Sequence, residues 1–300
     1  MASSLKKGSR GWWQQQIPKI VLAPSFSLIL FFVYGFIAWT AYISFSRSRM
    51  LPNYDLIGVR PYEKLWNSLN WQVALENLAI FGGLYIVICC VLGLFLAILL
   101  DQRIRIEGGL RPIFLYPMAL SFIVTGTAWK WFLNPGLGLE KTMQNWGWES
   151  FSFDWLVNPD MAIYTVVIAG VWQTSGFVMA MFLAGLRGID SEILKAAQLD
   201  GAPPYKVYTR IIIPQLRPVF LSAFIVLAHM AIKSYDLVIA LTGGGPGNAT
   251  ELPATFMYSY TFTRNQMAVG SASAMVMLMT IAAIIVPYLY SELKGGRNEH

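Results

Sequence analysis

Long apolar runs separated by short polar segments dominate this chain. A helix needs about 20 apolar residues to cross the hydrocarbon core of a membrane. Six runs reach that length, at residues 17–45, 73–100, 110–133, 161–186, 211–241 and 267–289. In lipid every backbone polar group must find a partner within the protein, so the runs are expected to be helices and not strands. The pattern predicts an all-α polytopic membrane protein with six transmembrane helices.

One polar segment differs from the other loops because it lies between two apolar runs and still favours helices. This segment, here called the insert, covers residues 187–214 and contains EILKAAQLDGAPPYKVYTRIIIP. Asp190 or Ser191 can cap a first helix, and Gly201 breaks it. Pro204 suits the start of a second helix. We predict a helix, a turn and a helix along the membrane surface between spans four and five.

The composition agrees with a membrane protein. Of 300 residues, 56% are hydrophobic and 13% are charged, whereas soluble domains carry about a quarter charged residues. The first apolar run is longer than that of a signal peptide and lacks a cleavage site, so it is predicted to be a retained span. No basic stripe interleaved with aromatic residues indicates nucleic-acid binding.

The distribution of Lys and Arg predicts the orientation, because cytoplasmic loops carry an excess of both. The richer set comprises the N-terminal segment, the loop between spans two and three, the insert and the C-terminal tail. Both termini and the insert are therefore predicted to be cytoplasmic. The loop after the first span is an exception, because it places four cations on the predicted outer side, namely Arg47, Arg49, Arg60 and Lys64.

Polar residues within the apolar runs are candidates for a translocation path, because polar groups at membrane depth usually face a bundle interior or a cavity. Gln173 and Thr174 interrupt run four, and Lys233, Ser234 and Asp236 interrupt run five. Lys233 and Asp236 are three residues apart, so they could pair on one helical face. The alternative interpretation is that such residues join packed helices.

The sequence shows no constellation that would make the chain an enzyme. The phosphate-loop pattern G-x-x-x-x-G-K-[ST] does not occur, and Gly243-Gly244-Gly245 reads as a tight turn. No set of acids, bases or metal ligands is clustered along the sequence. We therefore expect no catalytic residues, no metal and no cofactor on this chain.

The insert resembles the EAA loop of binding-protein-dependent ABC importer permeases. The signature of that loop is roughly EAAxxDGA followed by an aromatic residue and a proline, and residues 195–202 with Tyr208 and Pro214 match it. One position departs from the signature, because Lys195 stands where the family has glutamate, and Glu192 lies one turn earlier.

A second match supports the same family. Residues 236–247 end in LTGGGPG, which resembles the carbohydrate-type branch. The resemblance extends over about residues 71–289. It implies a permease core at 71–290 that contains the coupling loop at 187–214. The core would follow an N-terminal part, residues 1–70, with the first span and first periplasmic loop, and would precede a cytoplasmic tail at 291–300.

The resemblance implies that the chain is one half of a heterodimeric pore in a bacterial inner membrane, paired with a second homologous permease. The insert would be a coupling helix that docks on a cytoplasmic ABC ATPase dimer, and ATP-Mg would bind there and not on this chain. A periplasmic binding protein would deliver the sugar. The implied coupling residues are Glu192, Lys195, Ala196, Ala197, Asp200, Gly201, Ala202, Tyr208 and Pro214.

The nearest likeness is to glucose or mannose permeases of Gram-negative bacteria, which implies a monosaccharide substrate. Another carbohydrate-type substrate, an oligosaccharide or glycerol phosphate, is the alternative, and an ATP-independent secondary transporter is a further one. Sugar hydroxyls need hydrogen-bonding groups beside aromatic surfaces. The candidates for the sugar path are therefore Trp172, Gln173, Thr174, Phe177, Lys233, Ser234, Tyr235 and Asp236.

Overall fold

The computed structural model describes residues 7–102 and 107–295, and the regular elements in these ranges are helical, which confirms the predicted fold class. The α-helices are α1 (Lys7–Ile29), α2 (Gly35–Ile43), α3 (Arg60–Trp66), α4 (Leu69–Asp101), α5 (Glu107–Ala119), α6 (Phe122–Phe132), α7 (Leu139–Asn145), α8 (Ala162–Arg187), α9 (Ser191–Leu199), α10 (Pro204–Val207), α11 (Ile213–Gln215), α12 (Arg217–Ile232), α13 (Asp236–Leu241), α14 (Pro253–Tyr258) and α15 (Met267–Gly295). Three π-helical turns connect some of them, namely η1 (Leu30–Tyr34), η2 (Tyr208–Ile212) and η3 (Ser259–Thr263).

Within the described ranges, four helical segments are long and apolar enough to cross a membrane. They are residues 16–43, α4, α8 and residues 267–288 of α15. Two further runs are bent pairs, with 98° between α5 and α6 and 62° between residues 204–215 and α12. The number of spans is thus four, or up to six if each bent pair counts as one, and the six-span expectation stays a prediction.

The body of the molecule is built on the packing of α4 against α8, with α5 and α12 beside them. Its core includes Phe81 and Tyr85 from α4 and Val178 and Phe182 from α8, all buried. Gly176 brings α8 against the backbone of α5, because a Cβ at this position would collide with the carbonyl oxygen of Phe114. The close approach of α8 to α5 therefore depends on this small residue.

Runs three and five are not the uninterrupted helices that their hydropathy predicts. Run three breaks between α5 and α6, where Ser121 caps α6 through a bond from the Val124 amide to its hydroxyl oxygen (3.3 Å). Run five ends as a long helix at Ile232, and the rest of the run forms α13, which packs against α6. Hydropathy measures only polarity, and it does not register a helix break whose polar groups are satisfied inside the protein.

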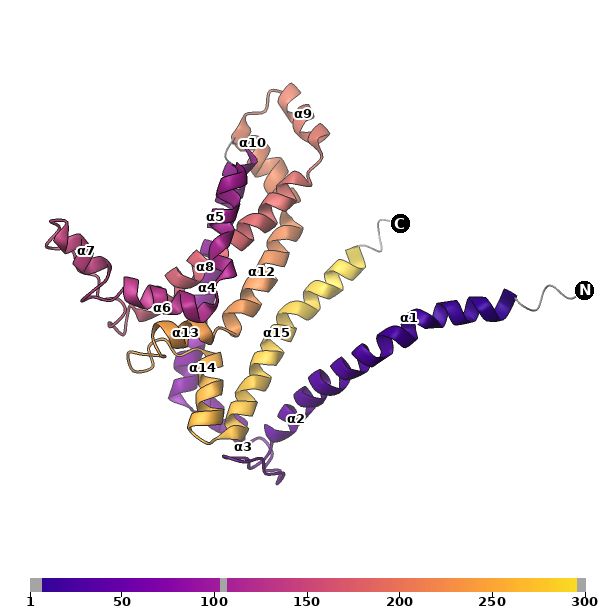
Figure 1. Ribbon diagram of the computed structural model, residues 1–300, viewed down its shortest axis with the longest axis vertical. Helices are drawn as coiled ribbons and strands as arrows, with labels where there is room; N and C mark the ends of the chain where they lie inside the picture. The colour runs from indigo at the N-terminus through magenta and orange to yellow at the C-terminus, as the bar shows by residue number, and fades with distance from the viewer. Residues whose placement is uncertain (1–6, 103–106, 296–300) are drawn as a thin grey trace, which may run out of the picture.

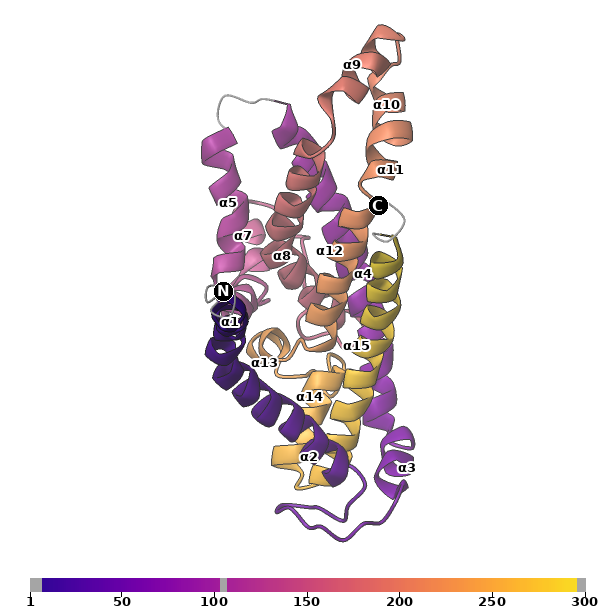
Figure 2. The same cartoon turned by 90° about the vertical axis from the view of Figure 1, so that its right-hand side faces the viewer.

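The first span forms an arm, defined here as α1, η1 and α2. Figure 1 shows the arm leaving the body near α3 and diverging from it, and its most apolar window is 0% buried. Within the described residues, the base of the arm at α2 packs against α15. The insert, with α9 and α10, lies at the end of the long axis opposite α3 (Figures 1 and 2).

Candidate functional site

The first helix of the insert, α9, begins with a side-chain cap. The amide nitrogen of Glu192 donates to a carboxylate oxygen of Asp190 at 2.9 Å. This bond satisfies one of the free N–H groups that every helix start leaves open. Of the two caps considered from the sequence, the structure therefore selects Asp190.

The end of α9 explains the Asp-Gly-Ala part of the motif. Gly201 has a φ of +69°, and the amide of Ala202 donates to the carbonyl oxygen of Ala197 at 3.0 Å. A left-handed residue followed by such a six-to-one bond is the Schellman ending of a helix. Beyond its chain neighbours, no atom of the described residues lies within 4 Å of a Cβ built on Gly201. There is therefore space for a side chain at this position, and glycine is favoured by the left-handed backbone conformation.

The second half of the insert is built from α10, η2 and α11. Pro204 opens α10, and Pro214 lies in the first turn of α11, where a missing N–H costs little. Between them, Tyr208 is half-buried, and its hydroxyl oxygen accepts a bond from the amide Nε2 of Gln102 at 2.8 Å. The aromatic residue of the motif thus ties the insert to the end of α4.

An ion-pair cluster at the base of the insert joins three long helices. Arg187, at the end of α8, lies 2.6 Å from the carboxylate of Glu107 on α5 and 3.8 Å from that of Asp101 on α4. Exposed pairs of this kind contribute about 0–1 kcal/mol each, so their main effect is to orient the helix ends. Sequence reasoning missed Asp101, Gln102 and Glu107. The signal available in the sequence was the two acidic residues, Asp101 and Glu107, that flank the loop between the second and third apolar runs.

The two alanines of the motif, Ala196 and Ala197, differ in their exposure to solvent. Ala196 is exposed, whereas Ala197 is buried, with 7% of its surface accessible. Neighbours on a helix point about 100° apart, so of these two implied coupling residues Ala196 is the one that faces outward. Two apolar side chains that sequence reasoning did not select extend the outward surface, Leu199 at 88% and Tyr205 at 65% exposure.

The charged coupling candidates lie on the surface of the insert. Glu192, Lys195, Asp200 and Gly201 are exposed, and Ala202 is half-buried. Among the described residues, neither Glu192 nor Lys195 makes an ion pair. Both side chains are therefore free to meet a partner.

Gln173 and Thr174, from the middle of α8, are buried between helices. The Gln173 Nε2 donates to the carbonyl oxygen of Leu120 at 2.8 Å, at the break between α5 and α6. The Tyr85 hydroxyl donates to the Oγ1 of Thr174 at 2.9 Å. The Oε1 of Gln173 is buried without a hydrogen-bond partner in the described part of the chain. Gln173 thus satisfies the free carbonyl that the broken helix leaves.

Lys233 and Asp236 are not paired, which corrects the prediction that they share a helical face. Lys233 is the C-cap that follows α12, and Asp236 is the first residue of α13, so the helix that would align them is broken. No ion pair joins them in the described residues. With Ser234 and Tyr235 they line a cavity of about 130 Å³ that Phe122, at the start of α6, also lines. The breaks of runs three and five therefore meet at this cavity.

Trp172 lines a separate and larger cavity, further along α6. This cavity of about 470 Å³ is lined by Ala128, Trp129, Phe132 and Trp172. The ring centroids of Trp129 and Trp172 are 5.9 Å apart. Phe177, by contrast, is half-buried and packs against the core. Aromatic walls of this kind suit an apolar ligand surface such as a sugar face.

No group of three or more His, Cys, Asp or Glu side chains in the described ranges is arranged to hold a metal ion.

Comparison with known proteins places this architecture in a family. Residues 90–294 match the family model described as binding-protein-dependent transport system inner membrane component. A probable ABC transporter permease protein of Pyrococcus horikoshii is 39% identical over 283 residues, which covers 93% of this chain and 97% of that protein. The xylose/arabinose import permease protein of Haloferax volcanii is 37% identical over 275 residues, covering 90% and 86%.

A solved structure shares the fold. The crystal structure of a bacterial ABC transporter involved in the import of the acidic polysaccharide alginate contains a chain that superposes with a TM-score of 0.79. The alignment covers 95% of this chain and 98% of that chain at 18% identity.

Proposed function

This chain belongs to the family of binding-protein-dependent transport system inner membrane components, and from this premise we propose that it forms half of the translocation pathway of an ATP-driven sugar importer. The membership confirms the resemblance drawn from the insert. The family consists of transport subunits, so the chain is a multi-pass permease of the inner membrane. ATP binding and hydrolysis take place on a separate subunit in this proposal.

The geometry of the insert carries the proposal that it is the coupling element. Its first helix is closed at both ends by its own residues, it lies at one end of the molecule, and its exposed surface combines Ala196 with Leu199 and Tyr205. An exposed apolar patch with a charged rim is typical of a protein-binding site. The hydrogen bond from Gln102 to Tyr208 and the ion pairs of Arg187 connect the insert to α4, α5 and α8. A movement of the insert would be transmitted to these helices through those contacts.

Both termini and the insert are cytoplasmic in this proposal, and the chain keeps the division into residues 1–70, 71–290 and 291–300. A second homologous permease completes the pore in this proposal, and the arm supports it because its most apolar window is 0% buried within the described part of the chain and is available to such a partner. A binding protein docks at the opposite end, where α3 lies (Figure 1).

The sugar path runs past the meeting point of the two helix breaks. Lys233, Ser234, Tyr235 and Asp236 present polar groups there, and Trp172 provides an aromatic wall nearby. We propose a monosaccharide such as glucose or mannose as the substrate. The relative named for xylose and arabinose import supports the monosaccharide class, because both of those sugars are monosaccharides.

Reconstitution tests the function directly. The chain, its partner permease, the ATPase and the binding protein are placed in proteoliposomes with ATP on the ATPase side, and uptake of labelled glucose is measured. We expect uptake that stops when the phosphate-loop lysine of the ATPase is replaced. Uptake that continues with the disabled ATPase would overturn the importer proposal. Competition by unlabelled mannose, xylose and maltose then ranks the substrates.

A further inference from the structure

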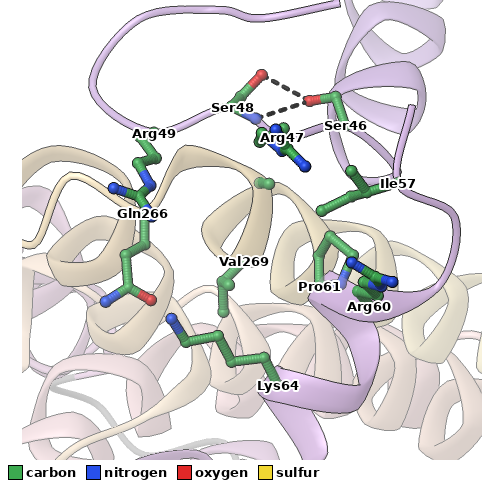
Figure 3. A pocket seen from close by; sticks show the side chains of 11 residues that line it. Ser46, Arg47, Ser48, Arg49, Ile57, Arg60, Pro61, Lys64, Gln266 and Val269 are labelled. Carbon is green, nitrogen blue, oxygen red and sulfur yellow. Dashed lines mark hydrogen bonds between the residues drawn. The ribbon is translucent and has the colours of Figure 1, made fainter. Parts of the chain in front are cut away.

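A pocket at the end of the molecule opposite the insert gathers the four cations that broke the orientation pattern. It has a volume of about 410 Å³ and lies between the loop after the first span, α3 and the start of α15. Figure 3 shows Arg47, Arg49, Arg60 and Lys64 around it, together with Gln266. The loop that follows the first span and the start of the last span thus contribute to one site.

The charge of this pocket has no counterpart within the described residues. None of the four cations lies within 4.0 Å of a carboxylate, since both ion pairs found there belong to Arg187. No acidic residue lines the pocket. Four like charges around one space repel one another, and a bound anion would remove that repulsion.

The backbone that carries the cations is firmly held. The Arg47 amide donates to the carbonyl oxygen of Asp55 at 2.9 Å. The carbonyl oxygens of Ser48 and Arg49 accept from Ala268 and Met267, each at 3.1 Å, and so close the start of α15. The hydroxyls of Ser46 and Ser48 lie 2.6 Å apart and are hydrogen-bonded (Figure 3). A preformed frame lowers the entropic cost of binding a ligand.

The position of the pocket along the spans indicates a lipid. The first apolar segment ends at residue 43 and the last begins at residue 267, so the pocket lies where the hydrocarbon core ends and phosphate headgroups begin. Exposed apolar side chains flank it on the same loop, including Phe45, Met50 and Leu51. An acyl chain would cover such side chains, whereas a soluble acidic partner would leave them in water.

We propose that this pocket binds the phosphate headgroup of an anionic phospholipid in the leaflet at the α3 end of the protein. The guanidinium groups of Arg47, Arg49 and Arg60 can each offer two parallel N–H donors to phosphate oxygens, and Lys64 adds a point charge. The bound lipid would join the first span to the last. This inference rests on the membrane location of the family and is independent of the transported sugar.

Native mass spectrometry of the full-length chain in detergent tests the site. The protein is titrated with phosphatidylglycerol and, separately, with zwitterionic phosphatidylcholine. The variant R47Q/R49Q/R60Q/K64Q should bind phosphatidylglycerol about 1,000-fold more weakly than the wild-type protein, because each of the four cations near an anionic lipid surface contributes about 1 kcal/mol. The control variant K130Q/K141Q removes two cations that do not line the pocket and should bind like the wild-type protein.

A second variant, R47K/R49K/R60K, keeps the charge and should retain most of the preference for phosphatidylglycerol, which separates loss of charge from loss of fold. Equal binding of phosphatidylglycerol by the glutamine variant and the wild-type protein would overturn the proposal. So would an unchanged lipid titration combined with loss of ATPase stimulation by the binding protein, because the pocket would then recognise an acidic protein surface. Tight binding of inorganic phosphate without retained lipid would assign the pocket to a free anion and overturn the lipid.

Discussion

The insert and the meeting point of the helix breaks are both polar interruptions of apolar sequence, but they are stabilised in opposite ways. The insert is closed by bonds between neighbours, from Glu192 to Asp190 and from Ala202 to Ala197. The breaks are closed by bonds across the body, such as that from Gln173 to Leu120, 53 residues apart. A locally closed element can move as a unit without unfolding, whereas an element closed by distant partners changes only when the packing around it changes.

This difference suggests a division of labour within one subunit. The insert is suited to follow a partner, because it is attached to the body through few polar contacts at its base. The helix breaks are suited to change when the packing of the body changes, because α6 and α13 meet there beside a cavity lined by polar residues. Substitutions that act on one region and not on the other would test the division.

The largest loss of stability is expected at Gly176, where α5 and α8 are in close contact. Gly176→Ala should lower the free energy of unfolding by about 3 kcal/mol, because the added Cβ collides with the carbonyl oxygen of Phe114 and two helices must separate. Gly83→Ala, on α4, is the matched control, since nothing lies within 4 Å of its Cβ. Thermal unfolding in detergent would measure both. Equal stabilities of the two variants would contradict the close crossing of α5 and α8.

Gln173→Leu should cost about 2 kcal/mol, because the buried carbonyl of Leu120 loses its donor. Transport should fall with stability, while binding of the ATPase to the insert should not change. Gln215→Leu, at an exposed position on α11, is the control for stability. A Gln173 variant with normal melting and normal uptake would show that the break in run three does not depend on this bond.

Gly201→Val should act on the insert alone. A β-branched residue in the left-handed region costs about 1–2 kcal/mol, and this strain falls on the ending of α9. We expect ATP hydrolysis that no longer drives uptake, with the melting of the body unchanged. Gly201→Asn, a residue that tolerates this conformation, should retain most of the uptake. Equal loss in both variants would mean that strain is not the cause.

Tyr208→Phe should have the smallest effect, about 1 kcal/mol or less, because it removes one exposed hydrogen bond from Gln102. The measurement is the rate of amide hydrogen exchange in the insert, which should rise while exchange in α8 stays constant. If exchange rises in α8 as well, the insert and the body are more tightly joined than the bonds at its base indicate.

Local chemistry explains which parts of the molecule could be predicted from the sequence. The cap at Asp190 and the turn at Gly201 depend on residues a few positions apart, so both were predictable and are observed. The all-α class followed from the length of the apolar runs and is confirmed. In each case the determining residues are neighbours along the chain.

The helix breaks could not be predicted, because they depend on distant partners. Hydropathy treats residues 110–133 as one run, while the structure stops a helix at Ala119 and satisfies the freed carbonyl of Leu120 from α8. Lys233 and Asp236 have helical spacing, but the helix ends between them. The roles of Asp101 and Glu107 were hidden for the same reason, since their partner Arg187 lies some 80 residues away.

The self-contained ending of α9 also has an evolutionary consequence. Because its start and its end are closed by its own residues, the outward side chains of this helix can be exchanged without disturbing the spans on either side. In the coupling role that we propose for the insert, a departure such as Lys195 would change the preference for a partner and leave the fold of α9 intact. Permeases built in this way could be paired with new ATPases by exchange of one short helix, the equivalent of α9.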